Sequence, residues 1–283
     1  MENLYQIGVI GSGAMGNGIA HVAAQSGLKT ILVDINQTQL DEALSLIDSN
    51  LDRQIKKNII TLDDKNSTLG NIILSTNLKD CQNVDLVIEA IPEKIDLKIS
   101  LFEEFDSICK DTAILASNTS SISITKLAEK TSRPSQVIGM HFMNPVPVMK
   151  LVEVINTNHT SSQTTEKIIA LAKKMNKVPI QCNDYPGFVS NRILMPMINE
   201  AIFCLEQNVA TKEAIDEIMK LGMAHPLGPL KLADLIGLDV CLDIMEVLQV
   251  GFNDIKYQPS NLLKEMVEKG LLGKKTGQGF YKY

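Results

Sequence analysis

Short apolar segments alternate with longer segments of helical periodicity through the first two thirds of the chain. Residues 7–10 and 30–33 are apolar runs of strand length, and residues 84–91 are largely apolar, as in strands that a parallel sheet buries on both faces. Residues 37–57 carry apolar side chains at intervals of three and four, which is the period of a helix. This alternation predicts an α/β domain with a mostly parallel sheet.

The pattern becomes wholly helical beyond residue 185. Further strands are expected at 71–75, 112–116, 137–141, 151–155 and 178–182, and further helices at 97–109, from 124 and at 164–175. The later segments with helical periodicity are 188–207, 212–221, 238–250 and 261–269. Residues 183–187, Asn-Asp-Tyr-Pro-Gly, have the composition of a linker. We therefore expect an α/β domain over residues 1–184 and an all-α domain over residues 185–283.

A glycine pattern follows the first predicted strand. Gly11, Gly13 and Gly16 have the spacing G-x-G-x-x-G. Gly11 permits a tight turn, Gly13 permits the close approach of a pyrophosphate, and Gly16 permits close packing of the next helix. Together with the strands and helix around it, this loop predicts a Rossmann-type dinucleotide-binding domain. The expected cofactor-binding loop comprises Gly11, Ser12, Gly13, Ala14, Met15 and Gly16.

Asp34 ends the second predicted strand, about 20 residues beyond the glycines. A carboxylate at this position accepts hydrogen bonds from the ribose hydroxyls of an adenosine, and it would repel the 2′-phosphate of NADP. Because no arginine lies nearby in the sequence, we expect NAD. The fingerprint alone leaves FAD open.

Composition narrows the classes of function. The net charge of −6 argues against general nucleic-acid binding. No apolar run is long enough to span a bilayer, and the first predicted strand starts too early to leave room for a signal peptide. The five cysteines show neither CxxC nor metal-ligand spacing. We therefore expect a cytoplasmic protein with no resident metal, no nucleic-acid partner and no membrane contact.

Two polar residues stand out against the apolar strands. His141 ends one predicted strand, and Glu153 lies in the middle of the next, where an ionised carboxylate needs a partner. His141 is the obvious candidate, and Glu153 would hold its imidazole in one tautomer and raise its basicity. A structural histidine in the core would fit the same pattern.

Other polar positions leave two interpretations open. Glu93 and Lys98 follow a strand end, and they either contact a cofactor or are ordinary first-turn helix residues. Ser120 lies in a hydroxyl-rich loop that either caps the next helix or presents a hydroxyl to a substrate. Arg53, Lys56 and Lys57, at the end of the long second helix, either form a solvated helix end or bind the phosphates of a bulky carrier.

Longer motifs give the chain a specific resemblance. They are Gly-Val-Ile-Gly-Ser-Gly-Ala-Met-Gly, Ala-Ser-Asn-Thr-Ser-Ser, Gly-Met-His-Phe-Met-Asn-Pro-Val-Pro-Val-Met-Lys-Leu-Val-Glu, Asp-Tyr-Pro-Gly-Phe-Val-Ser-Asn-Arg and Gly-Lys-Lys-Thr-Gly-Gln-Gly-Phe-Tyr. Over essentially its whole length the chain resembles the short-chain L-3-hydroxyacyl-CoA dehydrogenases, in particular the bacterial 3-hydroxybutyryl-CoA dehydrogenases. Met143 stands where an aromatic residue is usual, and Pro92 varies the loop after the fourth strand.

The resemblance implies roles for individual residues. His141 would be the general acid/base at the C3 oxygen of the substrate, and Glu153 would orient it. The residues implied to hydrogen-bond the reacting end of the substrate are Ser120 and Asn191. Those implied to hold NAD together with the glycine loop are Asp34, Glu93, Lys98, Asn144 and Lys275. Asn50 and Lys57 would contact coenzyme A, and the helical domain would form a homodimer.

We therefore expect reversible, NAD-dependent interconversion of (S)-3-hydroxybutyryl-CoA and acetoacetyl-CoA. One alternative is a related dehydrogenase of a non-CoA hydroxy acid, for which Lys56 and Lys57 would be ordinary surface lysines. Another is a cofactor-binding structural or regulatory protein without turnover. The presence of Ser120, His141, Glu153 and Asn191 argues against that class, because loss of catalysis usually removes at least one such group.

Overall fold

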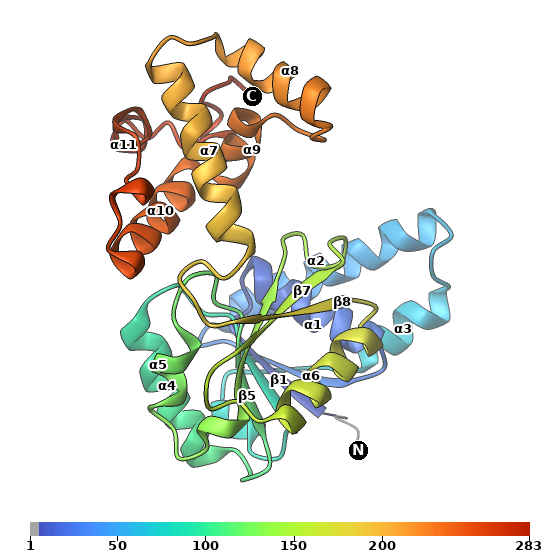
Figure 1. Ribbon diagram of the computed structural model, residues 1–283. Coiled ribbons are helices and arrows are strands. Elements are labelled where there is room, and N and C mark those ends of the chain that lie inside the picture. Colours follow the sequence, from blue (N-terminus) through green and yellow to red (C-terminus); the bar gives the residue numbers. More distant parts are fainter. Residues whose placement is uncertain (1–5) are drawn as a thin grey trace. The chain divides into compact units, whose positions relative to one another are not determined.

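The computed structural model describes residues 6–283, so the expectation that no signal peptide precedes the first strand concerns residues outside it. The chain divides into two compact units, Met1–Asp184 and Tyr185–Tyr283 (Figure 1). The predicted fold class is confirmed: the first unit is Rossmann-type, with a mostly parallel sheet, and the second is helical. Within residues 6–283, no helix combines the length and the apolar character needed to cross a bilayer.

The first unit is built on an eight-stranded sheet in the order β3-β2-β1-β4-β5-β6-β7-β8. The strands are β1 (Gln6–Ile10), β2 (Lys29–Val33), β3 (Ile72–Ser75), β4 (Leu86–Glu89), β5 (Ile114–Ser117), β6 (Val137–Phe142), β7 (Leu151–Asn156) and β8 (Val178–Asn183). The first six strands are parallel, whereas β7 runs antiparallel to β6 and parallel to β8. The carboxyl ends of the parallel strands therefore meet along one edge, which is where ligands bind in such sheets.

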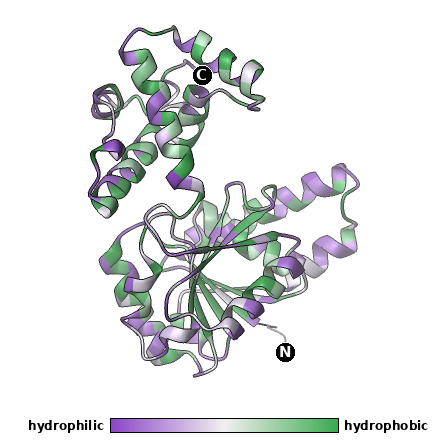
Figure 2. Cartoon of the chain, viewed as in Figure 1, coloured by the Kyte–Doolittle hydropathy of each residue, from purple (hydrophilic) through white to green (hydrophobic). Residues whose placement is uncertain are grey.

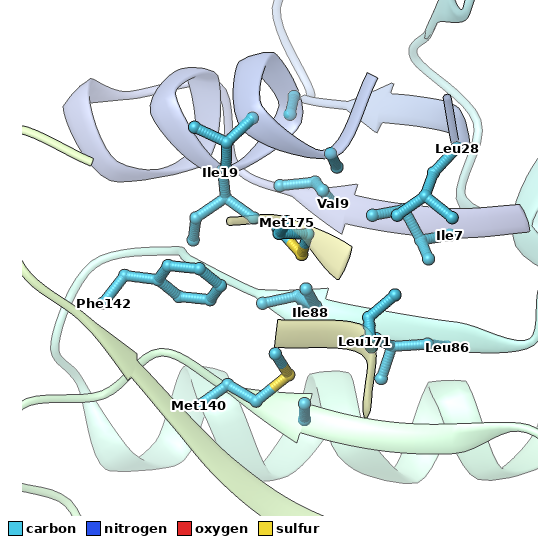
Figure 3. Close-up of a cluster of buried hydrophobic side chains, with 14 of the residues drawn as sticks. Ile7, Val9, Ile19, Leu28, Leu86, Ile88, Met140, Phe142, Leu171 and Met175 are labelled. Atoms are coloured by element: carbon cyan, nitrogen blue, oxygen red, sulfur yellow. The ribbon is translucent and has the colours of Figure 1, made fainter. Parts of the chain in front are cut away.

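Helices cover both faces of this sheet. They are α1 (Ala14–Gln25), α2 (Gln37–Lys56), α3 (Leu62–Gly70), α4 (Ile95–Ile108), α5 (Ile124–Ala128) and α6 (Ser162–Lys174), with α4 and α5 on one face and α1 and α6 on the other (Figure 1). Figure 3 shows the core on the second face, where Ile19 of α1 and Leu171 of α6 pack with Val9, Ile88 and Met140 from three strands. This packing fixes the strand ends from which the candidate site residues project.

One helix of the first unit has no counterpart in the sequence prediction. The α3 segment is largely polar, and with α2 it is among the most hydrophilic parts of the first unit (Figure 2). A capping box marks its start, because the Thr61 hydroxyl and the Asp64 carboxylate bond reciprocally to backbone N–H groups. Apolar periodicity misses such a helix, because local capping rather than a broad apolar face defines it.

The second unit consists of five α-helices and short 3₁₀ turns within the described chain. The helices are α7 (Ser190–Glu206), α8 (Lys212–Met223), α9 (Pro229–Ile236), α10 (Leu238–Phe252) and α11 (Asn261–Glu268). They enclose a core of their own, to which Ile198, Leu230 and Leu248 contribute fully buried side chains. The predicted start of the first of these helices at 188 was wrong, because Gly187 and Phe188 both have positive φ and α7 begins at Ser190. The short helix α9 was not predicted.

Candidate active site

The sheet places His141 and Glu153 directly opposite each other on the antiparallel strands β6 and β7. Residues opposed in this way project from the same face, so their side chains meet. Nδ1 of His141 lies 2.8 Å from Oε2 of Glu153, and both residues are buried. An ionised carboxylate only accepts hydrogen bonds, which assigns the proton to Nδ1 and leaves Nε2 as the atom available for proton transfer.

A serine hydroxyl contacts the other nitrogen of this imidazole. Oγ of Ser120 lies 3.1 Å from Nε2 of His141. Ser120 belongs to the loop that follows β5, and this strand lies beside β6 in the sheet. The arrangement brings an imidazole, its carboxylate partner and a hydroxyl together at the strand edge where ligands of α/β sheets bind.

The loop after β1 shows why each glycine is needed. Gly11 has a φ of 96°, and a Cβ at this position would lie 2.6 Å from the carbonyl oxygen of Ala90. A Cβ on Gly16 would lie 1.7 Å from the carbonyl oxygen of Gly11, so only glycine lets α1 pack this closely. A Cβ on Gly13, in contrast, would meet nothing within 4 Å. Gly13 therefore borders open space at the amino end of α1, where the phosphates of a dinucleotide fit.

Asp34 connects the end of β2 to this loop. Its Oδ2 accepts hydrogen bonds from the backbone N–H and the hydroxyl of Ser12, at 2.7 and 2.8 Å. Ser12 is buried, whereas Gly13 and Ala14 are exposed and Met15 is half-buried. The loop thus exposes its two central residues next to an anchored carboxylate, which suits a ligand with a pyrophosphate and a ribose.

Glu93 ties the loop after β5 to the loop after β4. Its Oε1 accepts hydrogen bonds from the Thr119 hydroxyl and, at 3.0 Å, from the backbone N–H groups of Ser120 and Ser121. Burial opposes ionisation of this carboxyl, but the Lys98 ammonium and the hydrogen bonds outweigh burial and lower the pKa of Glu93. Glu93 is therefore an anion that holds the Ser120 loop in place.

Lys98 is 1 % exposed and pairs with two carboxylates, those of Glu93 and Glu89. Glu89 is not among the predicted site residues. Nζ of Lys98 lies 2.6 Å from Oε1 of Glu89 and 3.1 Å from Oε2 of Glu93. The predicted alternatives for Lys98 were a cofactor contact and a first-turn helix residue, and it does lie in the first turn of α4. The signal for Glu89 was a charged residue at the end of an apolar strand, the same kind of signal as His141 gave.

A pocket of about 940 Å³ lies between the carboxyl ends of α1, α2 and α6, helix α3 and the loop between β6 and β7. The cationic residues on its wall are Arg53, Lys57, Lys150, Lys174 and Lys177. Asn50 also lines it, and its side-chain oxygen accepts a 3.0 Å hydrogen bond from Arg53. Both residues proposed from the resemblance to contact coenzyme A, Asn50 and Lys57, thus border a single basic pocket.

The remaining predicted site residues lie elsewhere in the chain. Asn144 is exposed in the loop that follows β6. Asn191 and Lys275 belong to the second unit, the first buried at the start of α7 and the second paired with Asp239 at 2.5 Å. Within residues 6–283, no group of three or more His, Cys, Asp or Glu side chains has a metal-binding arrangement.

Comparisons with known proteins place both units of the chain in one family. Residues 6–185 match the family model of the 3-hydroxyacyl-CoA dehydrogenase NAD-binding domain, and residues 187–283 match that of the C-terminal domain. A probable 3-hydroxybutyryl-CoA dehydrogenase of Deinococcus radiodurans is 55% identical over 278 residues, which cover 98% of this chain and 100% of the relative. The human mitochondrial hydroxyacyl-coenzyme A dehydrogenase is 42% identical, with 97% of this chain and 90% of the relative covered.

A solved structure resembles the chain equally closely. The crystal structure of (S)-3-hydroxybutyryl-CoA dehydrogenase from Ralstonia eutropha superposes with a TM-score of 0.97 at 50% identity and covers 99% of each chain. The expected cofactor, NAD, is confirmed by the family of the first domain, and the open space at Gly13 and the carboxylate of Asp34 fit it. The chain therefore belongs to the 3-hydroxyacyl-CoA dehydrogenase family and is an NAD-dependent oxidoreductase of that family.

Proposed function

We propose that the protein interconverts (S)-3-hydroxybutyryl-CoA and acetoacetyl-CoA reversibly, with His141 and Glu153 as its acid/base pair. The observation that carries the proposal is the buried contact of 2.8 Å between these two side chains, with Nε2 of His141 facing Ser120. An imidazole oriented by a carboxylate on one side, and directed at a hydroxyl on the other, suits proton transfer at a substrate oxygen.

The residues divide the work of the reaction. During oxidation, Nε2 of His141 accepts the proton of the C3 hydroxyl, and Glu153 stabilises the imidazolium through Nδ1–H. A nicotinamide held by the glycine loop and Asp34 would supply the hydride acceptor for C3. In reduction His141 returns the proton to the oxygen, while Ser120 and Asn191 donate hydrogen bonds that stabilise the charge developing there. We propose that Asp34, Glu93, Lys98, Asn144 and Lys275 contribute to cofactor binding with the glycine loop.

The basic pocket supports the coenzyme A part of the proposal. Its volume is within the usual range for small-molecule sites, and cations from α2, α6 and the β6–β7 loop surround it. A carrier with several phosphates is the kind of ligand that such a wall binds, since ammonium and guanidinium groups pair well with phosphate. We propose that Asn50 and Lys57 contact coenzyme A here.

The proposal extends to assembly and location. Among the described residues, more than half of the exposed large apolar side chains lie in the second unit, including Ile218 and Leu221 of α8. Large exposed apolar areas favour association, and we propose a homodimer formed through this unit.

The five cysteines are all free thiols, which suits the reducing cytoplasm that we propose as the protein's location.

The first test follows the oxidation of NADH by its absorbance with acetoacetyl-CoA as substrate. We expect turnover with NADH and much less with NADPH, because Asp34 repels a 2′-phosphate.

The same assay tests the acid/base pair. His141→Ala should lower kcat about 10³-fold, the usual contribution of a positioned acid/base group. Glu153→Gln should lower it by at least about tenfold, because an amide does not stabilise the imidazolium. Full activity of His141→Ala would refute the assignment.

The same assay also tests whether coenzyme A binds in the basic pocket. Lys57 borders the basic pocket and Lys56, its neighbour in sequence, does not, which makes Lys56→Ala a matched control. We expect Lys57→Ala to raise KM for acetoacetyl-CoA about tenfold, as for the loss of one charged contact, and Lys56→Ala to change it less than about twofold. Turnover of a free 3-oxo acid without turnover of the CoA ester would instead favour the non-CoA dehydrogenase.

A further inference from the structure

Two charged side chains beside the candidate site, Glu89 and Lys98, are almost completely withdrawn from water. Glu89 is the last residue of β4 and is 0 % exposed, and Lys98 is 1 % exposed. A buried ion pair gains little or no stability over well-packed apolar residues of the same volume, because both charges lose their hydration. Stability alone therefore gives no reason for placing these charges here.

The hydrogen bonds of the Glu89 carboxylate are directed at two neighbouring segments. Oε1 accepts from Nζ of Lys98 at 2.6 Å and from the backbone N–H of Ile91 at 2.7 Å. Oε2 accepts from the hydroxyl of Ser117 at 2.5 Å. One carboxylate thus connects the end of β4, the first turn of α4 and the end of β5.

Two chains of contacts lead from Glu89 to the loop that carries Ser120. In the first, Lys98 contacts Glu93 at 3.1 Å, and Glu93 accepts the backbone N–H of Ser120 at 3.0 Å. In the second, the Ser117 hydroxyl accepts the backbone N–H of Thr119 at 3.1 Å. Both chains end within one residue of Ser120.

We infer that Glu89 is a positioning residue, which fixes Lys98 and Ser117 and through them holds the hydroxyl of Ser120 against Nε2 of His141. The kinetic consequence rests on the proposed function, whereas the structural consequence does not. Loss of the Glu89 charge leaves Lys98 with only part of its compensation and loosens the loop over residues 119–121. Ser120 then spends less time in contact with His141.

The structural consequence is tested by amide hydrogen exchange of Ser120 and Ser121 in the whole protein. Glu89→Gln keeps the shape of the side chain and removes its charge. We expect it to speed exchange of these two amides about tenfold, because their local opening becomes easier. Lys110→Met is the control, since it removes a partly exposed ion pair with Asp85 at the other end of β4. Unchanged exchange in Glu89→Gln would overturn the inference.

The kinetic consequence is tested by a double-mutant cycle with acetoacetyl-CoA and NADH. We expect Glu89→Gln to lower kcat about tenfold in the wild-type background and less than about twofold in Ser120→Ala, because both changes act on the same contact. Equal losses in the two backgrounds would show that Glu89 does not act through Ser120. If the wild type does not reduce acetoacetyl-CoA, the proposed function fails, and the exchange measurement still decides the role of Glu89.

A third variant separates positioning from charge balance. Glu89→Gln combined with Lys98→Met removes both buried charges, and such neutral replacements often restore stability. We expect the melting temperature to recover towards that of the wild type while kcat stays low, because the second substitution removes the cation that pairs with Glu93. Recovery of kcat together with the melting temperature would reduce the pair to a structural element and overturn the inference.

Discussion

Gly13 and Gly16 belong to the same loop but differ in what surrounds them. A Cβ on Gly16 would overlap the carbonyl oxygen of Gly11, whereas a Cβ on Gly13 would point into open space. Gly13 also has an ordinary negative φ of −59°, which alanine adopts without strain. We therefore propose that Gly13 serves the ligand, whereas Gly16 serves the fold.

Alanine substitutions should separate these two roles. Gly16→Ala is expected to destabilise the protein by about 3 kcal/mol or more, because α1 must move away from the loop. Gly13→Ala should keep the melting temperature within a few degrees of the wild type and weaken NADH binding at least about tenfold. Thermal unfolding and titration of NADH fluorescence measure the two effects. Equal loss of stability in both variants would contradict this division.

At the level of single residues, the sequence was most informative where a charge interrupted an apolar strand. Glu153 in the middle of β7 demanded a partner, and His141 was correctly chosen as the residue that contacts it. Glu89 gives a similar signal, but it does not stand out, because a charged residue at a strand end is also typical of an ordinary strand boundary. Its contacts with Ser117 and Lys98 depend on tertiary structure that no spacing encodes.

The contact between α1 and α2 encloses an unusual histidine. His21 of α1 is 1 % exposed, and its Nε2 lies 3.3 Å from the side-chain amide nitrogen of Gln54 on α2. Burial, followed by the nearby charge of Lys177, lowers the pKa of His21 to about 4, against a smaller opposing hydrogen bond from Gln25. The native protein therefore holds this imidazole neutral over the range in which an unfolded chain protonates it.

This histidine predicts a particular response to acid. Between pH 6.5 and about 4 the unfolded state binds one more proton at His21 than the native state, so stability falls as the pH falls. The total loss approaches roughly 3 kcal/mol once the pH is below the native pKa. Urea unfolding across this range should show a steeper pH dependence for the wild type than for His21→Gln. Parallel curves for the two proteins would refute the prediction.

Whole elements were predicted well where apolar residues recur with a clear period. The long helix α2 was expected over 37–57 and spans Gln37–Lys56, and each strand of the sheet lies within two residues of an expected run. The missed helices α3 and α9 are short, and α3 has little apolar character. The direction of β7 was also outside the reach of periodicity, because an antiparallel and a parallel strand bury the same residues.

On the scale of the whole molecule, the distribution of charge matters more than its sum. The chain has a net charge of −6, yet five cations border one pocket of the first unit. Anionic ligands are thus repelled by the average field and attracted locally, which favours phosphate-bearing ligands at that pocket. The acidic composition and the proposed coenzyme A site are therefore compatible.

Assembly is the second property of the whole molecule, and α8 is the place to test it. Leu221 is 82 % exposed and Ile218, one turn away, is 60 % exposed. If this helix contributes to the proposed homodimer, Leu221→Glu should convert a dimer into a monomer, because a buried unpaired carboxylate is costly. Light scattering after gel filtration measures the mass, with Lys220→Glu on the same helix as the control. A dimer that survives Leu221→Glu would place the interface elsewhere.

The antiparallel pairing of β6 and β7 has a consequence for how the protein can diversify. The register of the two strands sets the contact between His141 and Glu153, whereas the loop between them supplies Pro147, Val148 and Lys150 to the basic pocket. In the proposed reaction, proton transfer and coenzyme A recognition therefore depend on separate parts of one hairpin. If the proposed roles hold, substitutions in that loop change which acyl carrier is bound while the contact between His141 and Glu153 keeps its geometry. New substrate specificities can then arise on this scaffold with the same acid/base pair.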